Sequence, residues 1–518
     1  MHVDARRLEN GTLIEGDLAI VGAGAAGITL AMEWVGRGRK VLLLEGGGFE
    51  RDPRMQDLYR GEIVGRPYFP LDAARLHYFG GTSNHWAGLC STFEAIDFEK
   101  RDWVPHSGWP ITRADLDPFY PRAGRVLDLA SDRWDADWWG TQGRKRGRYP
   151  LDPAVVWPKM WQFSAPTRLG AKYRDAIVNA RDVHLYTHAN VVEIQAADGL
   201  RAVSGLRVRT LDGKEHQVRA GRYVLACCSL QNARLLLESD RQARGGLGNA
   251  HDVVGRYFME HIEMPAGKLV IAPGQAGNTG IYRADWGKDR GVAELALGPA
   301  VQRERRILNG TASLQGINEQ APLRSTFQMM TPEVVDAFER AGRGDTTAFR
   351  VLQRLDEYFP SLPPEQREFR LFSRQEQAPN PASRVTLGTE RDAMGMRRLR
   401  FDWQLTELDK RSMRTFYQVL GHEMGRRGVG RVRALEWLRT PDTEWPSFLS
   451  GGWHHMGTTR MHQDPRQGVV DANCRVHGLA NLYVAGASVY TTSGSVNPTL
   501  TLVALTLRLS DHLQGTLA

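Results

Sequence analysis

The chain has 518 residues, of which 42% are hydrophobic and 24% are charged, as in an ordinary globular protein. Because this length exceeds one typical hydrophobic core, we expect two closely associated domains. The net charge of +8 comes mostly from arginines scattered along the chain. The one dense basic run, at 144–148, is typical of a solvated loop, so we expect no nucleic-acid partner.

The sequence shows no targeting or membrane segment and no metal-binding pattern. No apolar run reaches the roughly 18 residues that cross a bilayer, and residues 1–16 lack the apolar core of a signal peptide. We therefore expect a cytoplasmic protein, although export with a partner that carries the signal would leave no trace. The cysteines have no CxxC spacing, which predicts buried thiols and no metal site at Cys90, Cys227, Cys228 and Cys474.

A βαβ unit is predicted near the start of the chain. Residues 17–21 (DLAIV) form an apolar run typical of a buried parallel strand, and residues 40–45 (KVLLLE) form a second one. Between them lie the motif GAGAAG at 22–27 and a helical stretch at 28–38 that ends in glycines. The whole unit therefore fits into about thirty residues.

The motif at 22–27 matches the GxGxxG fingerprint of dinucleotide-binding proteins. In chain order, its glycines permit a tight turn, let the backbone approach a pyrophosphate, and let the helix pack closely on the strand; they are Gly22, Gly24 and Gly27. Free N–H groups for phosphate are expected at the helix start, at Ala25 and Ala26. Glu45 ends the second strand, where an acid accepts hydrogen bonds from ribose hydroxyls. The alternative is a glycine-rich turn that binds nothing.

The rest of the chain indicates a second unit inside the first. Residues 131–165 are irregular and rich in Trp and Pro, which predicts a surface excursion; its tryptophans either stack on sugar faces or, as we prefer, pack in the core or in oligomer contacts. Residues 201–220 predict a hairpin with an Asp-Gly turn. Residues 262–446 mix strand and helix patterns without a nucleotide fingerprint. Glycine-rich motifs and a final helix return from 447 onwards.

Three further motifs follow the fingerprint. They read FGGTSNHWAG at 79–88, ACCSLQNARLLLES at 226–239, and WHHMGTTRM at 453–461 followed by 476–513. Together with the fingerprint they resemble the glucose-methanol-choline (GMC) family of flavin oxidoreductases. The resemblance covers the two ends of the chain, and loosely the segment EQAPNPASRVTL at 376–387. It implies FAD as the cofactor and oxidation of an alcohol or hemiacetal carbon.

The resemblance implies an α/β fold with two domains. We expect a Rossmann-like FAD-binding domain formed by 1–261 and 447–518, with the catalytic residues in the second part. The substrate domain at 262–446 is expected to be α+β, with a mixed or antiparallel sheet flanked by helices. Within the family, a His–Asn catalytic pair and the His-Trp dipeptide at 85–86 are similar to the branch of pyranose oxidase and bacterial glycoside 3-oxidizing enzymes.

The resemblance assigns the catalytic base to His454, the first residue of an H-x-x-G-T pattern. A neutral histidine within hydrogen-bond reach of a hydroxyl can take its proton near neutral pH. The alternative is that His455 acts while His454 packs. The second member of the pair is Asn497, whose amide can donate to the substrate oxygen. Because Asn497 precedes Pro498, it also has the sequence of a helix N-cap.

In some members of the family, the histidine of a GG-x-S-x-H motif like that at 80–85 is bonded covalently to the flavin. His85 therefore either carries a covalent FAD or only packs near the flavin ring. Ala87 stands where pyranose oxidase has a threonine near the flavin, and the missing hydroxyl puts oxidase activity in doubt. Val191 is expected to meet the adenine through its backbone. The other cofactor contacts that the resemblance implies are Gly81, Thr82, Asn84, Trp86, Gly486, Ala487, Pro498 and Thr499.

The sequence thus predicts an FAD-dependent oxidoreductase that acts on a small molecule. The leading substrate is a secondary hydroxyl of a sugar or glycoside, with oxygen or a redox partner as the electron acceptor. The alternatives are oxidation of a non-sugar alcohol and a lyase that keeps FAD as a structural group. The sequence leaves homo-oligomerisation and the identity of the substrate open.

Overall fold

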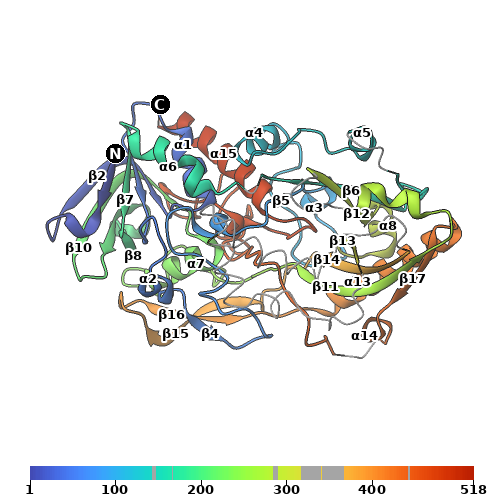
Figure 1. The fold of residues 1–518 in the computed structure, drawn as a ribbon. Coiled ribbons are helices and arrows are strands. Elements are labelled where there is room, and N and C mark those ends of the chain that lie inside the picture. The colour runs from blue at the N-terminus through green and yellow to red at the C-terminus, as the bar shows by residue number, and fades with distance from the viewer. Residues whose placement is uncertain are drawn as a thin grey trace.

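The structure is a computed structural model that describes residues 1–142, 147–165, 167–283, 290–316, 340, 367–440 and 444–517. Most of the basic run expected at 144–148 lies outside these ranges. Figure 1 shows two lobes, one that contains both termini and one built around a second sheet. None of the helices in the described ranges is long and apolar enough to cross a membrane.

The lobe with the termini is built on an eight-stranded sheet of order β1-β7-β3-β2-β10-β9-β8, with β18 paired to β10. The pairs from β1 to β10 and the pair β10–β18 are parallel, whereas β10, β9 and β8 form an antiparallel meander. This is the Rossmann-like arrangement that the sequence predicts. Its strands are β1 (His2–Asp4), β2 (Leu13–Val21), β3 (Val41–Leu44), β7 (Val183–Thr187), β8 (Asn190–Ala196), β9 (Val203–Arg209), β10 (Glu215–Leu225) and β18 (Leu482–Val484).

The glycine motif explains how β2 turns sharply into α1 (Ala25–Glu33). Gly22 has a φ of 101°, and a Cβ on it would lie 2.8 Å from the carbonyl oxygen of Ala226. A Cβ on Gly27 would lie 1.8 Å from the carbonyl oxygen of Gly22, so the helix could not approach the turn. A Cβ on Gly24 would meet no atom of the described chain within 4 Å. The first and third glycines are therefore required for packing, and the second faces open space.

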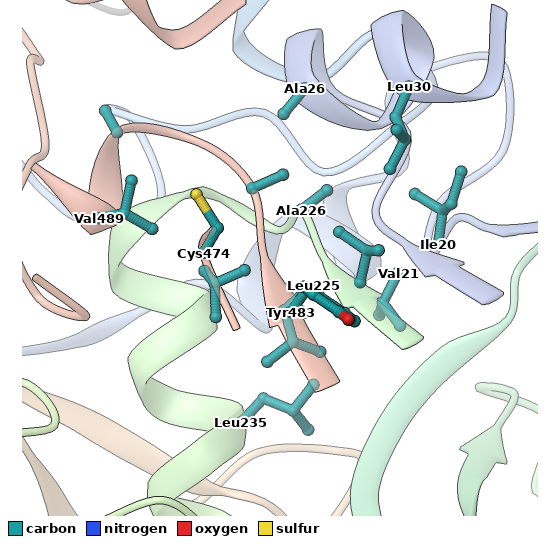
Figure 2. Packing of buried hydrophobic residues seen from close by; sticks show 14 of the residues in the cluster. Ile20, Val21, Ala26, Leu30, Leu225, Ala226, Leu235, Cys474, Tyr483 and Val489 are labelled. Atoms are coloured by element: carbon teal, nitrogen blue, oxygen red, sulfur yellow. The ribbon is translucent and has the colours of Figure 1, made fainter. Parts of the chain in front are cut away.

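Apolar side chains hold the helices of this lobe against its sheet. In Figure 2, β2, β10 and β18 lie between α1 and α7, and Leu30 of α1 and Leu235 of α7 are almost completely buried. Burial of one leucine side chain contributes about 1.5–3 kcal/mol. The C-terminal helix packs on α1 and α4, which returns the end of the chain to this lobe. These helices are α2 (Pro53–Asp57), α4 (Tyr120–Val126), α6 (Leu169–Asn179), α7 (Cys228–Glu238) and α15 (Thr499–Thr516).

The second lobe is built on an antiparallel sheet of order β17-β11-β14-β13-β12-β6-β5. Its strands are β5 (Leu89–Cys90), β6 (Val156–Phe163), β11 (Ile262–Ile271), β12 (Gly291–Leu297), β13 (Gly310–Gly316), β14 (Glu368–Gln375) and β17 (Gly430–Ala434). The amphipathic helix α13 packs along β17. An antiparallel sheet with helices beside it agrees with the expected α+β unit. The remaining helices are α3 (Ala95–Phe98), α5 (Ala136–Thr141), α8 (Pro299–Arg305), α13 (Glu407–Arg426) and α14 (Glu436–Arg439).

The prediction of a surface excursion at 131–165 is wrong. This segment contains β6, which lies between β12 and β5 inside the second sheet. Trp161 on β6 is fully buried, and the Arg374 guanidinium lies 4.6 Å from its ring centre. Residues of β6 pair with residues 291–297, more than a hundred positions later in the chain. A local sequence pattern cannot show such a pairing. Trp139 and Trp161 are buried core residues, as preferred, whereas Trp134, Trp138 and Trp157 are only partly buried.

A three-stranded sheet crosses the predicted domain boundaries. It has the order β15-β16-β4, from β15 (Arg384–Arg391), β16 (Arg397–Asp402) and β4 (Gly61–Ile63). Val385, Phe401 and Trp403 are buried in the same apolar core as the first sheet. The segment around β15 and β16 therefore packs with the lobe of the termini, although it lies within 262–446.

One local prediction is confirmed by the structure, and a second is confirmed in part. The hairpin expected at 201–220 is formed by β9 and β10, and Gly213 in its turn has a φ of 92°. The four cysteines are free thiols. Burial is complete for Cys90 and Cys474, whereas Cys227 and Cys228 at the start of α7 are only partly buried.

We predict that Gly27→Ala destabilises the folded chain, because the added methyl group would collide with the Gly22 carbonyl oxygen. The expected cost is about 1–3 kcal/mol or more, measured as a lower thermal midpoint and a lower soluble yield. Gly425→Ala is the matched control, because Gly425 also lies in a helix and a Cβ there meets no described atom outside that helix within 4 Å. Equal thermal midpoints for the two variants would contradict the packing argument.

Candidate active site

A cavity of about 1220 Å³ is lined by residues from both sheets. Ligand pockets commonly enclose roughly 300–1,000 Å³, so this one has room for a dinucleotide together with a second small molecule. Nearly all residues expected to contact the cofactor line it. They are Gly22, Gly24, Ala25, Ala26, Glu45, Gly81, Thr82, His85, Trp86, Ala87, Val191, Gly486, Ala487, Asn497, Pro498 and Thr499.

Two expected cofactor contacts do not line the cavity. Gly27 lies in the first turn of α1, and its contribution is the close packing described above. The Asn84 side-chain amide donates a hydrogen bond to the Phe79 carbonyl at 2.9 Å, which braces the loop from within. The sequence placed Asn84 in the site because it lies in the same motif as His85. The backbone of the 3₁₀ turn Gly81–Asn84 directs its side chain to the loop instead.

The glycine end of the cavity fits a nucleotide. The open space beside Gly24 is the space that a pyrophosphate would need. Glu45 is buried, and its carboxylate accepts the N–H groups of Ala23 and Gly47, both at 2.9 Å. Burial raises its pKa, and these hydrogen bonds oppose the shift. Glu45 therefore holds the glycine turn in place, and each carboxylate oxygen retains capacity to accept a ribose hydroxyl.

His85 is a buried side chain without a hydrogen-bond partner in the part of the chain that the structure describes. Neither ring nitrogen forms a hydrogen bond with any described residue, and the ring stacks on Trp453 with centroids 4.9 Å apart. Burial lowers the pKa of His85 to about 3, so the ring is neutral. A buried polar group normally has a hydrogen-bond partner. Unpaired nitrogens that line the cavity therefore fit contact with a bound cofactor.

Asn497 also presents an unpaired polar atom to the cavity. Its Oδ1 atom is buried and has no hydrogen-bond partner within the described ranges. The expectation that Asn497 is the N-cap of the last helix is wrong, because α15 has Pro498 at that position and no side-chain cap. The Asn497 amide is consequently free to bind a ligand. Its neighbour Thr499 begins α15, so the positive end of that helix also lies at the cavity.

The two adjacent histidines have different partners. The Nδ1 atom of His454 lies 2.9 Å from Nδ1 of His261, and the Nε2 atom of His455 lies 2.9 Å from the Tyr68 hydroxyl. Burial lowers the pKa of both rings, to about 3 for His455 and well below the ordinary value for His454. Both rings line the cavity. The bond to Tyr68 occupies the Nε2 atom of His455, whereas His454 uses only Nδ1.

Glu260 fixes the backbone beneath these histidines. Its carboxylate accepts the N–H of His261 at 2.8 Å and the N–H of His454 at 2.9 and 3.0 Å. The Tyr68 hydroxyl donates a further hydrogen bond to the same carboxylate. Burial raises the pKa of Glu260 to about 7. One carboxylate thus connects the start of β11 with the C-terminal segment of the chain.

A cluster of buried charges lines the cavity on the strands of the second sheet. Arg374 on β14 forms ion pairs with Glu263 on β11 at 2.7 Å and with Glu294 on β12 at 3.1 Å. The Thr311 hydroxyl donates to Glu294 at 2.5 Å. Arg374 and both glutamates line the same cavity as His454. Such a cluster can donate and accept several hydrogen bonds to one polar ligand.

This cluster and the residues around Glu260 are not among the sites that the sequence predicts. A signal was present in the segment FMEHIEMPAG at 258–267, where two acids and a histidine interrupt an otherwise apolar run. Ionisable residues in a buried strand are uncommon and often mark a site. Glu294 and Arg374 lie singly in separate strands, and their local sequence carries no comparable signal.

The parallel sheet with its glycine turn, and the cavity beside that turn, define a dinucleotide-binding protein. A family model described as FAD dependent oxidoreductase matches residues 17–366. A second model, described as GMC oxidoreductase, matches residues 379–506. The chain belongs to the GMC family of FAD-dependent oxidoreductases. The second match begins well before the C-terminal return predicted at 447, so the likeness includes β15, β16 and α13.

Curated relatives align over almost the whole chain at low identity. The 2-methyl-1,2-propanediol dehydrogenase of Mycolicibacterium austroafricanum is 23% identical, over 96% of this chain and 95% of its own length. The 6'''-hydroxyparomomycin C oxidase of Streptomyces lividus is 25% identical, over 97% and 92%. Among solved structures, pyridoxine 4-oxidase from Mesorbium loti superposes with a TM-score of 0.52 at 18% identity, over 96% of this chain and 99% of that one. This structural likeness concerns the fold.

Proposed function

We propose that this enzyme oxidises a secondary hydroxyl of a sugar or glycoside, with His454 as the base and Asn497 as a hydrogen-bond donor. The buried cluster of Arg374, Glu263 and Glu294 in the cavity is the observation that carries this proposal. A polyhydroxylated ring offers several donors and acceptors to these charged groups. A simple alcohol has too few hydroxyls to replace the water that it would displace from them.

His454 is suited to take the proton of the hydroxyl. Burial and the nearby Arg374 guanidinium lower its pKa, so the ring is neutral and can accept a proton. After that transfer, the positive ring lies near two carboxylates, with Nδ1 3.7 Å from Glu263 and 3.9 Å from Glu260. FAD, when bound, supplies the acceptor for the hydride that leaves the carbon bearing this hydroxyl. The Asn497 amide can donate to the hydroxyl oxygen and hold it in place.

The alternative is a non-sugar alcohol, which the relative named for 2-methyl-1,2-propanediol supports. The electron acceptor, oxygen or a redox partner, is a separate question. Ala87 lines the cavity without a hydroxyl, which supports a dehydrogenase over an oxidase. Re-admission of oxygen to the reduced enzyme tests this directly, because an oxidase regains its yellow colour rapidly.

We predict that anaerobic mixing with D-glucose or methyl β-D-glucopyranoside bleaches the flavin absorbance faster than 2-methyl-1,2-propanediol does. His454→Asn should slow this bleaching by about 10²–10⁴-fold, because the hydroxyl loses its base. His462→Asn is the control, since His462 does not line the cavity. Faster bleaching by the diol would favour the alternative substrate class. Unchanged bleaching in His454→Asn would reject His454 as the base.

We predict that Glu294→Gln weakens sugar binding by about 5- to 10-fold, because a charge-assisted hydrogen bond becomes a neutral one. The limiting rate of flavin bleaching at saturating sugar should change little, since Glu294 is assigned to binding. Stopped-flow absorbance over a range of sugar concentrations separates the two quantities. Glu304→Gln on the exposed surface of α8 is the matched control. A loss confined to the limiting rate would contradict the assignment.

We propose that His85 is the attachment point of a covalent FAD. Its buried, neutral ring lines the cavity, and neither nitrogen has a partner among the described residues. Acid precipitation of the holoenzyme should therefore leave a yellow pellet, and His85→Ala should leave a colourless one with FAD in the supernatant. A colourless wild-type pellet would show that His85 only contacts the cofactor.

A further inference from the structure

We propose that His261 is a positioning residue that fixes the tautomer of His454, so that Nε2 of His454 is the atom that takes the substrate proton. This inference rests on the proposed role of His454 as the base. His261 lies immediately before β11, and its side chain is completely buried. Its Nε2 atom contacts the backbone carbonyls of 493–494, and its Nδ1 atom contacts the ring of His454.

The carbonyl groups determine which atom donates the hydrogen in each of these bonds. The Nε2 atom of His261 lies 3.2 Å from the Ser493 carbonyl oxygen and 3.0 Å from the Gly494 carbonyl oxygen. A carbonyl oxygen only accepts, so Nε2 of His261 must carry the hydrogen. A neutral imidazole carries one ring hydrogen, and burial, which lowers the pKa of His261 to about 3, keeps this ring neutral. Its Nδ1 atom is therefore an acceptor.

The bond to His261 then fixes the tautomer of His454. Its Nδ1 atom lies 2.9 Å from an acceptor, so Nδ1 of His454 must donate the hydrogen of that bond. The ring of His454 is neutral, so its Nε2 atom carries no hydrogen and has a free lone pair. That is the state a general base needs. A chain of hydrogen bonds, here called the relay, thus joins the two backbone carbonyls to His261 and His261 to His454. His454 in turn lines the cavity.

The backbone holds the two rings in register. The segments 259–263 and 450–456 lie antiparallel, with mutual hydrogen bonds between Met259 and Met456 and a bond from the Glu263 N–H to the Ser450 carbonyl. Glu260 accepts the N–H groups of both His261 and His454, as described above. Neither ring can shift along the two paired segments without breaking these hydrogen bonds. The bond between the rings is thus part of the fold.

Proton transfer leaves this bond intact. When Nε2 of His454 forms a bond to the hydroxyl proton, the O–H electron pair remains with the substrate oxygen and the ring gains one positive charge. Nδ1 keeps its hydrogen and its bond to His261. The other charged groups that face the pair are Glu263, Glu260 and Arg374, and the two carboxylates lie 3.7 and 3.9 Å from Nδ1 of His454. His261 itself gains and loses no proton in the step.

A bound metal ion is the competing use of the same side chains. Glu260, His261 and His454 each place one potential ligand atom within 4.8 Å of the others. A cation bound between the two Nδ1 atoms would need the lone pair of each. The proposed relay uses one of these atoms as a donor, so the two uses exclude each other. The sequence predicts no metal site, and the experiments below test that prediction as well.

Nitrogen NMR of the holoenzyme labelled with ring-¹⁵N histidine tests the tautomer without any substrate. The signals of His454 are those missing from the spectrum of His454→Asn. We expect Nδ1 of His454 at the shift of a protonated nitrogen and Nε2 at that of an unprotonated one. His261→Phe should convert His454 partly or wholly to the other tautomer. His261→Asn should preserve the wild-type pattern, because the amide carbonyl of the new side chain can still accept from Nδ1. A protonated Nε2 in the wild type would overturn the proposal.

Kinetics provide a second readout with the same variants. His261→Phe should slow anaerobic bleaching by D-glucose about 10- to 100-fold, with unchanged FAD content and sugar affinity, because a histidine in the wrong tautomer is a poor base. His261→Asn should recover most of that loss. His216→Phe is the control, since His216 is also buried, bonds the Ala5 carbonyl at 3.1 Å and does not line the cavity.

The outcomes separate this inference from the proposed function. Slow bleaching in His454→Asn with normal bleaching in His261→Phe would reject the relay alone. Normal bleaching in His454→Asn would reject the base, whatever the NMR spectrum shows. One equivalent of a divalent metal in the purified holoenzyme, lost in His261→Phe, would replace the relay by a metal site. Absence of such a metal together with the expected tautomer shift would support the relay.

Discussion

The buried Glu260 carboxylate is the interaction on which the arrangement of the site depends. It accepts two backbone N–H groups, from His261 and His454, and the hydroxyl of Tyr68. These residues come from three distant parts of the chain. Removing a buried acceptor would leave its donors unsatisfied, at a cost of about 1–3 kcal/mol for each. Burial raises the pKa of Glu260 to about 7, and the three hydrogen bonds favour the charged form against this shift.

This constraint explains why a chain divided into several segments forms one cavity. The N-terminal segment supplies the glycine turn, the C-terminal segment supplies His454 and Asn497, and the second sheet supplies the charged cluster. Glu260 ties the C-terminal segment to the residues immediately before β11, and so to the second sheet. The cavity is therefore formed only when strands distant in sequence have paired. Long-range pairing of this kind is slow to form.

The sequence predicted those parts of the fold and site that depend on local geometry. The turn at 22–27 and the hairpin at 201–220 each need glycine at a particular backbone conformation, which local sequence reveals. The course of β6 could not be predicted, because its partner β12 is far along the chain. Asn84 shows the limit of motif transfer, since its side chain bonds the loop and not the cavity. Arg374, Glu263 and Glu294 become a site only when three strands align.

Strand β11 and the residue before it link base positioning with substrate binding. His261 and Glu263 are two positions apart, so in an extended segment their side chains point to the same side. His261 contacts the base, and Glu263 pairs with Arg374 in the cavity. A shift of this segment by a fraction of an ångström would move both groups together. A change in packing that shifts the backbone of this segment should therefore alter the limiting rate and the sugar affinity together. Replacement of one side chain, His261 here or Glu294 on another strand, should alter only one of the two.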